Sequence, residues 1–101
     1  MFQKLKQYKD LRDSAKKLQT QLSAETFHVE TWGGNVSMIM DGNQAVMALD
    51  IKADVLKPEN KQKLEESIKE AVGEGVKKVQ RSVAQKIQKG EIQVPDFPGK
   101  K

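Results

Sequence analysis

The sequence predicts an α+β fold with the element order α-β-β-β-α, in which a three-stranded antiparallel meander is flanked by an N-terminal helix and a long C-terminal helix. Two long segments with helical periodicity and a central segment of alternating apolar residues support this prediction. A chain of 101 residues is expected to form a single domain. Its expected parts are the N-terminal helix (1–24), the β-meander and connector (25–56), the C-terminal helix (57–90) and a flexible tail (91–101).

The first predicted helix, from Phe2 to Ala24, contains no Gly or Pro and is rich in Lys, Gln and Leu, which favour helix formation. Its apolar residues recur in steps of three and four, which places them on one narrow stripe. We expect this stripe to dock on the chain's own sheet, on the second helix or on a partner subunit. The stripe contains Tyr8, Leu11, Ala15, Leu18 and Leu22.

The central segment, Glu25–Ile51, reads as three short strands. Two turn signals divide it, Gly33-Gly34 and Asp41-Gly42-Asn43, and in the second the glycine is expected to supply the positive φ of a tight hairpin. Alternating apolar residues predict one apolar sheet face, which the flanking helices must cover. That face is expected to contain Phe27, Val29, Val36, Met38, Met40, Met47, Leu49 and Ile51.

The second helix is predicted to begin at Pro58, which favours the first helical position, and to stop at Gly90. Gly73 and Gly75 lie inside it, and each weakens a helix by roughly 1 kcal/mol relative to Ala. We expect close approach of another backbone, or a bend, to explain them. The predicted apolar stripe contains Leu64, Ile68, Val72, Val76, Val79, Val83 and Ile87.

Charge is distributed unevenly along the chain, whose net charge is +4. Residues 1–24 and 57–90 each carry a net charge of +4, whereas residues 25–56 carry −4. In the second predicted helix the acids come early and the bases late, an order that the helix dipole favours, so these charges could simply face solvent. The first helix, however, is basic throughout. Two basic helical faces therefore suggest an anion-binding surface. The candidate anion-binding residues are Lys6, Lys9, Arg12, Lys16, Lys17, Lys77, Lys78, Arg81 and Lys89.

Few residues suggest other chemistry. The chain has no cysteine, and His28 is its only histidine, so we expect no disulfide, metal site or cofactor. No nucleophile lies in a catalytic motif, so neither enzymatic activity nor a small-molecule substrate is expected. Trp32 could stack on a base, but packing at the sheet end is the more frequent role. With no signal peptide and no apolar run of about 20 residues, we expect a cytoplasmic protein without membrane contact.

The order of elements resembles the YbaB/EbfC family of small bacterial nucleoid-associated proteins. The resemblance rests on the Met1-Phe2 start, on the turn and second strand GNVSMIMDG (34–42), and on LDIKADVL (49–56) at the end of the third strand. It extends over residues 1 to about 90. Lys52-Ala53 stand where the family tends to have Asp-Pro, and the tail lacks the family's glycine- and methionine-rich ending.

The resemblance implies a homodimer whose helices project like tweezers and bind double-stranded DNA in the nucleoid with limited sequence specificity. We expect the basic helical faces to contact mainly phosphates, because no base-reading constellation is visible. Two alternatives remain open. The same helices could hold an acidic protein partner, as in a protein-interaction or chaperone-like module, or the chain could be a structural homo-oligomer whose charge serves solubility.

Overall fold

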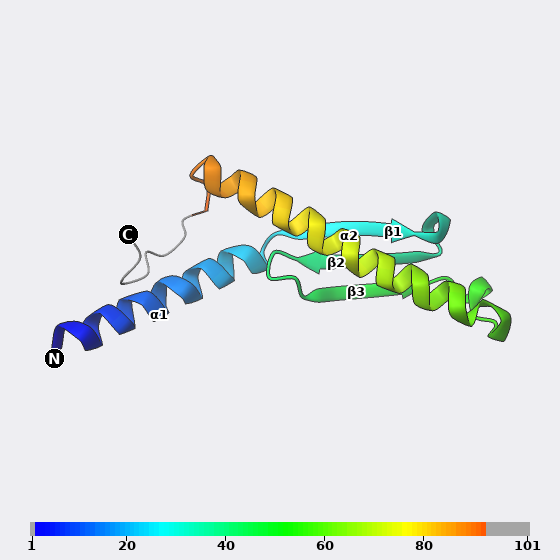
Figure 1. Ribbon diagram of the computed structural model, residues 1–101, viewed down its shortest axis with the longest axis horizontal. Coiled ribbons are helices and arrows are strands. Elements are labelled where there is room, and N and C mark those ends of the chain that lie inside the picture. Colours follow the sequence, from blue (N-terminus) through cyan, green and yellow to red (C-terminus); the bar gives the residue numbers. More distant parts are fainter. Residues whose placement is uncertain (1, 93–101) are drawn as a thin grey trace.

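A computed structural model describes residues 2–92 of the chain, with side chains from Lys6 onward. The helix α1 (Phe2–Ser23) is followed by the strands β1 (Thr26–Thr31), β2 (Val36–Asp41) and β3 (Val46–Ile51) and by the long helix α2 (Lys61–Gln88). The strands form one antiparallel sheet in the order β1-β2-β3, so the predicted α+β architecture is confirmed. Helix α2 crosses one face of this sheet, and α1 projects from one end of it (Figure 1).

The tail predicted at 91–101 lies largely outside the described residues, which end at Ile92. The side chain of Ile92, the fourth residue beyond α2, is buried. Within the described part of the chain, neither helix has the length and apolar character that crossing a membrane requires.

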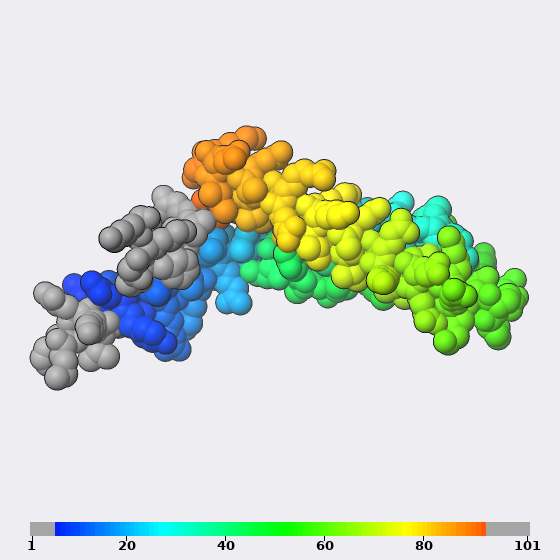
Figure 2. All heavy atoms as spheres, in the orientation of Figure 1, coloured from blue at the N-terminus to red at the C-terminus, as the bar shows by residue number. Residues whose placement is uncertain are grey.

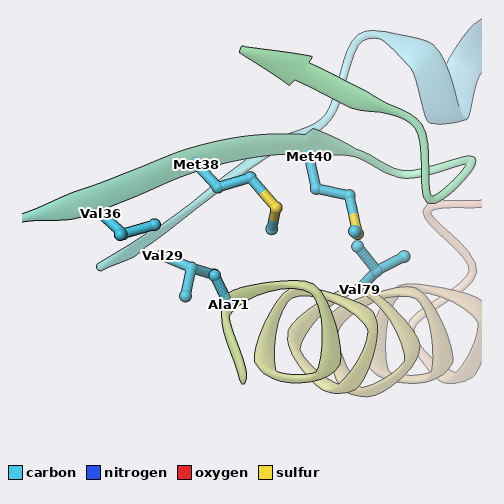
Figure 3. Packing of buried hydrophobic residues seen from close by; sticks show 6 residues of the cluster. All are labelled: Val29, Val36, Met38, Met40, Ala71 and Val79. Atoms are coloured by element: carbon cyan, nitrogen blue, oxygen red, sulfur yellow. The ribbon is translucent and has the colours of Figure 1, made fainter. Parts of the chain in front are cut away.

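The hydrophobic core lies between α2 and the first two strands (Figure 3). Alternation along β1 and β2 sends every second side chain toward the helix, as the sequence predicts. Burying a side chain of this size contributes roughly 1.5–3 kcal/mol to folding. The fully buried cluster consists of Val29, Val36, Met38, Met40, Ala71 and Val79.

The part of α2 closest to the sheet is a row of mostly small residues spaced four apart, Ser67, Ala71, Gly75 and Val79, all of them buried. The predicted stripe shares Val79 with this row, and its Val72 is 38% exposed. Four more of its residues are partly buried against the core, namely Leu64, Ile68, Val76 and Val83. The most deeply buried line of α2 is therefore this row and not the centre of the predicted stripe, because small side chains let the helix backbone approach the sheet more closely than branched ones do.

The two glycines of α2 have different roles. A Cβ atom on Gly75 would lie 2.7 Å from the Cε atom of Met38, so this glycine makes room for core side chains rather than for the other backbone that the sequence suggested. A Cβ atom on Gly73 would meet nothing within 4 Å. Close packing therefore explains Gly75 and leaves Gly73 unexplained.

Strand β3 is covered only in part, and the predicted apolar face is wrong for Met47, whereas Leu49 and Ile51 lie opposite the buried Met38 and Val36. Leu49 is 46% exposed and Met47 is 61% exposed. Along β2 the partner shifts from Ala48, opposite Ile39, to Val46, opposite Met40, so Met47 has no direct partner on β2. This bulge breaks the alternation, and Val46 takes the place expected for Met47 beside Met40.

The β2–β3 turn differs from the tight hairpin that the sequence predicts. The positive φ of 65° belongs to Gln44 rather than to Gly42. The Asp41 carboxylate accepts hydrogen bonds from the N–H groups of Asn43 (2.8 Å) and Ala45 (3.0 Å), which stabilises a longer turn. Gly42 instead lets the end of α1 lie close to the turn, because a Cβ atom at this position would be 2.5 Å from the carbonyl oxygen of Leu22 in α1.

The α-helical part of α2 begins later than predicted. Pro58 opens a short 3-10 turn, Pro58–Asn60, that leads directly into α2 at Lys61. At the other end Gly90 adopts a φ of 77°, and the Glu91 N–H group donates to the Lys86 carbonyl at 2.9 Å. A glycine in this conformation closes the helix, as predicted, since it satisfies the last free carbonyls.

Candidate nucleic-acid interface

Helix α1 is attached to the sheet through its last turn. The Gly42 N–H group donates to the Leu22 carbonyl at 2.9 Å, and the Asn43 side-chain amide donates to the Gln19 carbonyl at 2.9 Å. Farther along the helix, Tyr8 is 71% exposed. The apolar stripe of α1 thus docks along neither the sheet nor α2 in the described structure, which leaves a partner subunit as the remaining expectation.

The described chain is elongated because α1 extends it at one end. Its principal extents are 63 × 28 × 22 Å, and its radius of gyration is 18.6 Å. A compact domain of this length would have a radius of about 13 Å. The C-terminal half of α2 overhangs the same end of the sheet from which α1 leaves, and the two helices diverge there (Figure 1).

All nine cations predicted from the sequence have exposed side chains. They form two groups on two segments of the chain, and both segments reach toward the same end of the molecule (blue and orange in Figure 2). The first group lies on α1 and contains Lys6, Lys9, Arg12, Lys16 and Lys17, and the second lies on the C-terminal half of α2 and contains Lys77, Lys78, Arg81 and Lys89. The cations therefore occupy the two segments that diverge from one end of the sheet.

Acidic residues dominate the opposite part of the molecule. Residues 25–74 contain ten acidic and five basic side chains, whereas residues 75–89 contain five basic and no acidic ones. Within this acidic part, the Lys61 amine forms an ion pair with the Glu65 carboxylate at 2.9 Å. The hydrogen bond to Glu65 raises the pKa of Lys61 above its ordinary value. The two ends of the molecule thus differ in the sign of their charge.

Two lysines of α2 have partners that the sequence analysis missed. The Lys78 amine donates to the carbonyl of His28 in β1 at 2.9 Å, so it also ties the helix to the sheet. Lys86 forms an ion pair with the carboxylate of Glu25, which lies between α1 and β1. These partners are far apart in sequence, and no local pattern links them.

The other residues singled out from the sequence have structural roles. Trp32 is half-buried, packs against the core and has the Lys63 amine 6.0 Å from its ring centroid. His28 lies exposed on the open face of the sheet, with its ring 3.3 Å from the Ser37 hydroxyl. Among residues 2–92, no group of three or more His, Cys, Asp or Glu side chains is arranged to hold a metal ion.

Comparison with known proteins agrees with this architecture. A nucleoid-associated protein of Syntrophobacter fumaroxidans is 30% identical over 96 residues, which cover 93% of this chain and 87% of the relative. A nucleoid-associated protein of Gemmatimonas aurantiaca is 31% identical over 97 residues, covering 94% and 93%. A crystal structure of an uncharacterised protein from Helicobacter pylori shares the fold, with a TM-score of 0.63 at 19% identity over 77% of this chain and 82% of the other.

The sequence model of one family matches residues 1–91, which is nearly the whole chain. It confirms the resemblance that the turn and strand motifs suggest. On this evidence the chain belongs to the YbaB/EbfC DNA-binding family.

Proposed function

We propose that this protein binds double-stranded DNA in the bacterial nucleoid and that two basic helical segments make most of the contacts. The observation that carries the proposal is that both segments extend toward the same end of the molecule (Figure 2). Family membership supports it, as do relatives that are named nucleoid-associated proteins. The acidic part of the chain then faces away from the polyanion.

The proposed contacts are mainly with phosphates. Lysines spread along a helix neutralise phosphates and release counterions, which gives affinity that depends on salt and little on sequence. The proposed contact residues are the cations predicted from the sequence: Lys6, Lys9, Arg12, Lys16, Lys17, Lys77, Lys78, Arg81 and Lys89. Lys78 is the least available of them, because its amine already donates to the His28 carbonyl.

A titration of duplex DNA at two salt concentrations tests this function. Replacing Lys77, Arg81 and Lys89 together by Gln removes three charges from α2. If a dimer places all six on phosphates, the slope of log K against log salt becomes shallower by up to about 5, at roughly 0.9 per phosphate. Native binding that is absent at low salt, or unaffected by salt, would contradict the proposal.

A matched control comes from the acidic part of the chain. Replacing Lys52, Lys57 and Lys69 by Gln removes the same number of exposed charges. Because the proposal assigns these lysines no phosphate contact, the salt slope of this variant should equal that of the native protein. An equal decrease of the salt slope in both triple variants would mean that net charge alone governs binding.

We further propose that the protein acts as a homodimer formed through β3 and the adjacent side of α2. Lys78 lies over β1, so the opposite side of α2, with Val72, is turned toward β3. Val46 and Leu49 are exposed on the helix side of β3, which is also an edge strand of the sheet. Two such edges related by a twofold axis pair antiparallel and bury these apolar groups.

Sedimentation equilibrium tests the dimer. Leu49→Lys places a charge in the proposed interface and should give monomers at concentrations where the native protein is dimeric. Ile39→Lys is the control, because Ile39 is also exposed but lies on the opposite face of the sheet. A dimer that persists with Leu49→Lys would place the interface elsewhere, with the apolar stripe of α1 as the next surface to test.

The partly exposed apolar stripe of α1 favours a second candidate function, binding of an acidic protein partner. A projecting helix with apolar side chains flanked by lysines suits an acidic amphipathic helix. Affinity capture from a nuclease-treated lysate separates the two candidates. Partners that persist after nuclease treatment support the second function, whereas their loss supports DNA binding.

A further inference from the structure

Glu25 contacts three parts of the fold, which are the end of α1, the β2–β3 turn and the last turn of α2. Glu25 lies between α1 and β1, and its N–H group donates to the Leu22 carbonyl at 3.1 Å. Its own carbonyl accepts the N–H group of Gly42, in the β2–β3 turn, at 3.0 Å. Its carboxylate pairs with the amine of Lys86 in the last turn of α2.

The ion pair is placed where it can resist screening. The side chains of Glu25 and Lys86 are 37% and 26% exposed, so the pair is less hydrated than one on an open surface. The helix also ends at this point, because the Lys86 carbonyl accepts the Glu91 N–H group at 2.9 Å. The half-buried contact therefore joins the residue that follows α1 to the last turn of α2.

We propose that the Glu25–Lys86 pair is a strut that fixes the position of α1 relative to the C-terminal half of α2, and so lets both basic segments engage one DNA duplex. Glu25 and Lys86 are then positioning residues of the interface, with no phosphate contact of their own. This inference rests on the proposed DNA binding and assigns a geometric role to an acid inside a basic region.

The proposal predicts an effect opposite in sign to simple electrostatics. Glu25→Gln removes a negative charge near the basic segments, which by charge alone should tighten DNA binding. If the strut positions the segments, their simultaneous engagement is impaired and affinity falls by at least about threefold at constant salt. The control is Asp13→Asn, which removes an exposed acid of α1 and should leave binding unchanged or tighter.

A charge reversal provides the rescue. The double variant Glu25→Lys with Lys86→Glu keeps the net charge and rebuilds an ion pair between the same two positions. Its affinity for DNA should return to within about twofold of the native value, since the shared geometry sets the avidity. If the double variant binds DNA as weakly as Glu25→Lys alone and Lys86→Glu alone, the two residues do not act as a pair.

Distances between the segments give a readout that does not depend on DNA. The chain contains no cysteine, so Ser14→Cys on α1 and Gln80→Cys on α2, both at exposed positions, accept spin labels without competing sites. Pulsed electron resonance on labelled chains diluted with excess unlabelled protein then reports distances within one subunit. Glu25→Gln and Lys86→Met should both shift or broaden the distribution, and Asp13→Asn should not.

The outcomes separate this inference from the proposed function. If the native protein fails to bind DNA, the function is wrong, while the distance measurement still decides whether the strut exists. If native DNA binding is normal, and Glu25→Gln binds as tightly as Asp13→Asn with an unchanged distance distribution, the strut is wrong. Circular dichroism at the working temperature confirms that each variant is folded before either measurement.

Discussion

The contact between Gly75 and the sheet gives the sharpest prediction on stability. We compare Gly75→Ala with Gly73→Ala, because both changes raise the helix propensity of α2 by about 1 kcal/mol. At position 75 the new Cβ would lie 2.7 Å from the Cε atom of Met38 and 3.2 Å from the Cε and Sδ atoms of Met40. Both methionine side chains are 1% exposed, so neither can move out into solvent.

The magnitude follows from these opposing effects. Adding a methyl group to a packed core costs about 1–3 kcal/mol, and the ends of flexible methionines place this contact in the lower half of that range. Gly75→Ala should therefore change the free energy of unfolding by between about 0 and 1 kcal/mol in the destabilising direction. Gly73→Ala, with nothing within 4 Å of the new atom, should stabilise by about 1 kcal/mol.

Urea denaturation at one fixed protein concentration measures this difference, because any contribution from subunit association is then the same for both variants. In thermal unfolding, each kcal/mol corresponds to a shift of about 4–8 °C for a domain of this size. Equal stability of the two alanine variants would refute the conclusion that close packing determines the glycine at position 75.

Three further predictions concern contacts around the sheet. Gly42→Ala would place a Cβ 2.5 Å from the carbonyl oxygen of Leu22, so the end of α1 must move; we expect a loss of about 2 kcal/mol or more and faster hydrogen exchange in the last turn of α1. Thr31→Val removes the buried hydrogen bond of 2.8 Å from the Thr31 hydroxyl to the Ser67 carbonyl, and should lower the free energy of unfolding by about 1 kcal/mol in urea titrations. Asp41→Ala leaves two turn amides without their carboxylate acceptor and should cost about 1–3 kcal/mol by thermal denaturation, whereas Asp41→Asn keeps an acceptor oxygen and should cost less.

The fold follows from patterns that are local in the chain. Alternation in the central segment and the spacing of apolar residues in the flanking segments are sufficient to assign the helices and strands, because each depends on the geometry of a single element. The orientation of α2 could not be obtained in this way. Periodicity identifies the Val and Ile stripe, but the row that packs most closely contains the small residues Ser67, Ala71 and Gly75. Small residues allow close approach only where a sheet faces them, so the sequence of the helix alone does not signal this row.

The candidate interface could be predicted in part for the same reason. Exposure of the basic side chains follows from their position opposite an apolar stripe, which the sequence shows directly. The Glu25–Lys86 and Lys78–His28 contacts depend on where α2 crosses the sheet, so no spacing in the sequence signals them. The bulge opposite Met40 is likewise a property of the paired strands and not of β3 alone.

The separation of charge between the two ends of the molecule also has a kinetic consequence. A molecule with ten acids against five bases in residues 25–74, and only bases in residues 75–89, carries a permanent electric dipole along its length. The field of a polyanion exerts a torque on such a dipole and turns the basic end forward before contact. Productive encounters then make up a larger fraction of collisions, and this orienting effect weakens as added salt shortens the range of the field.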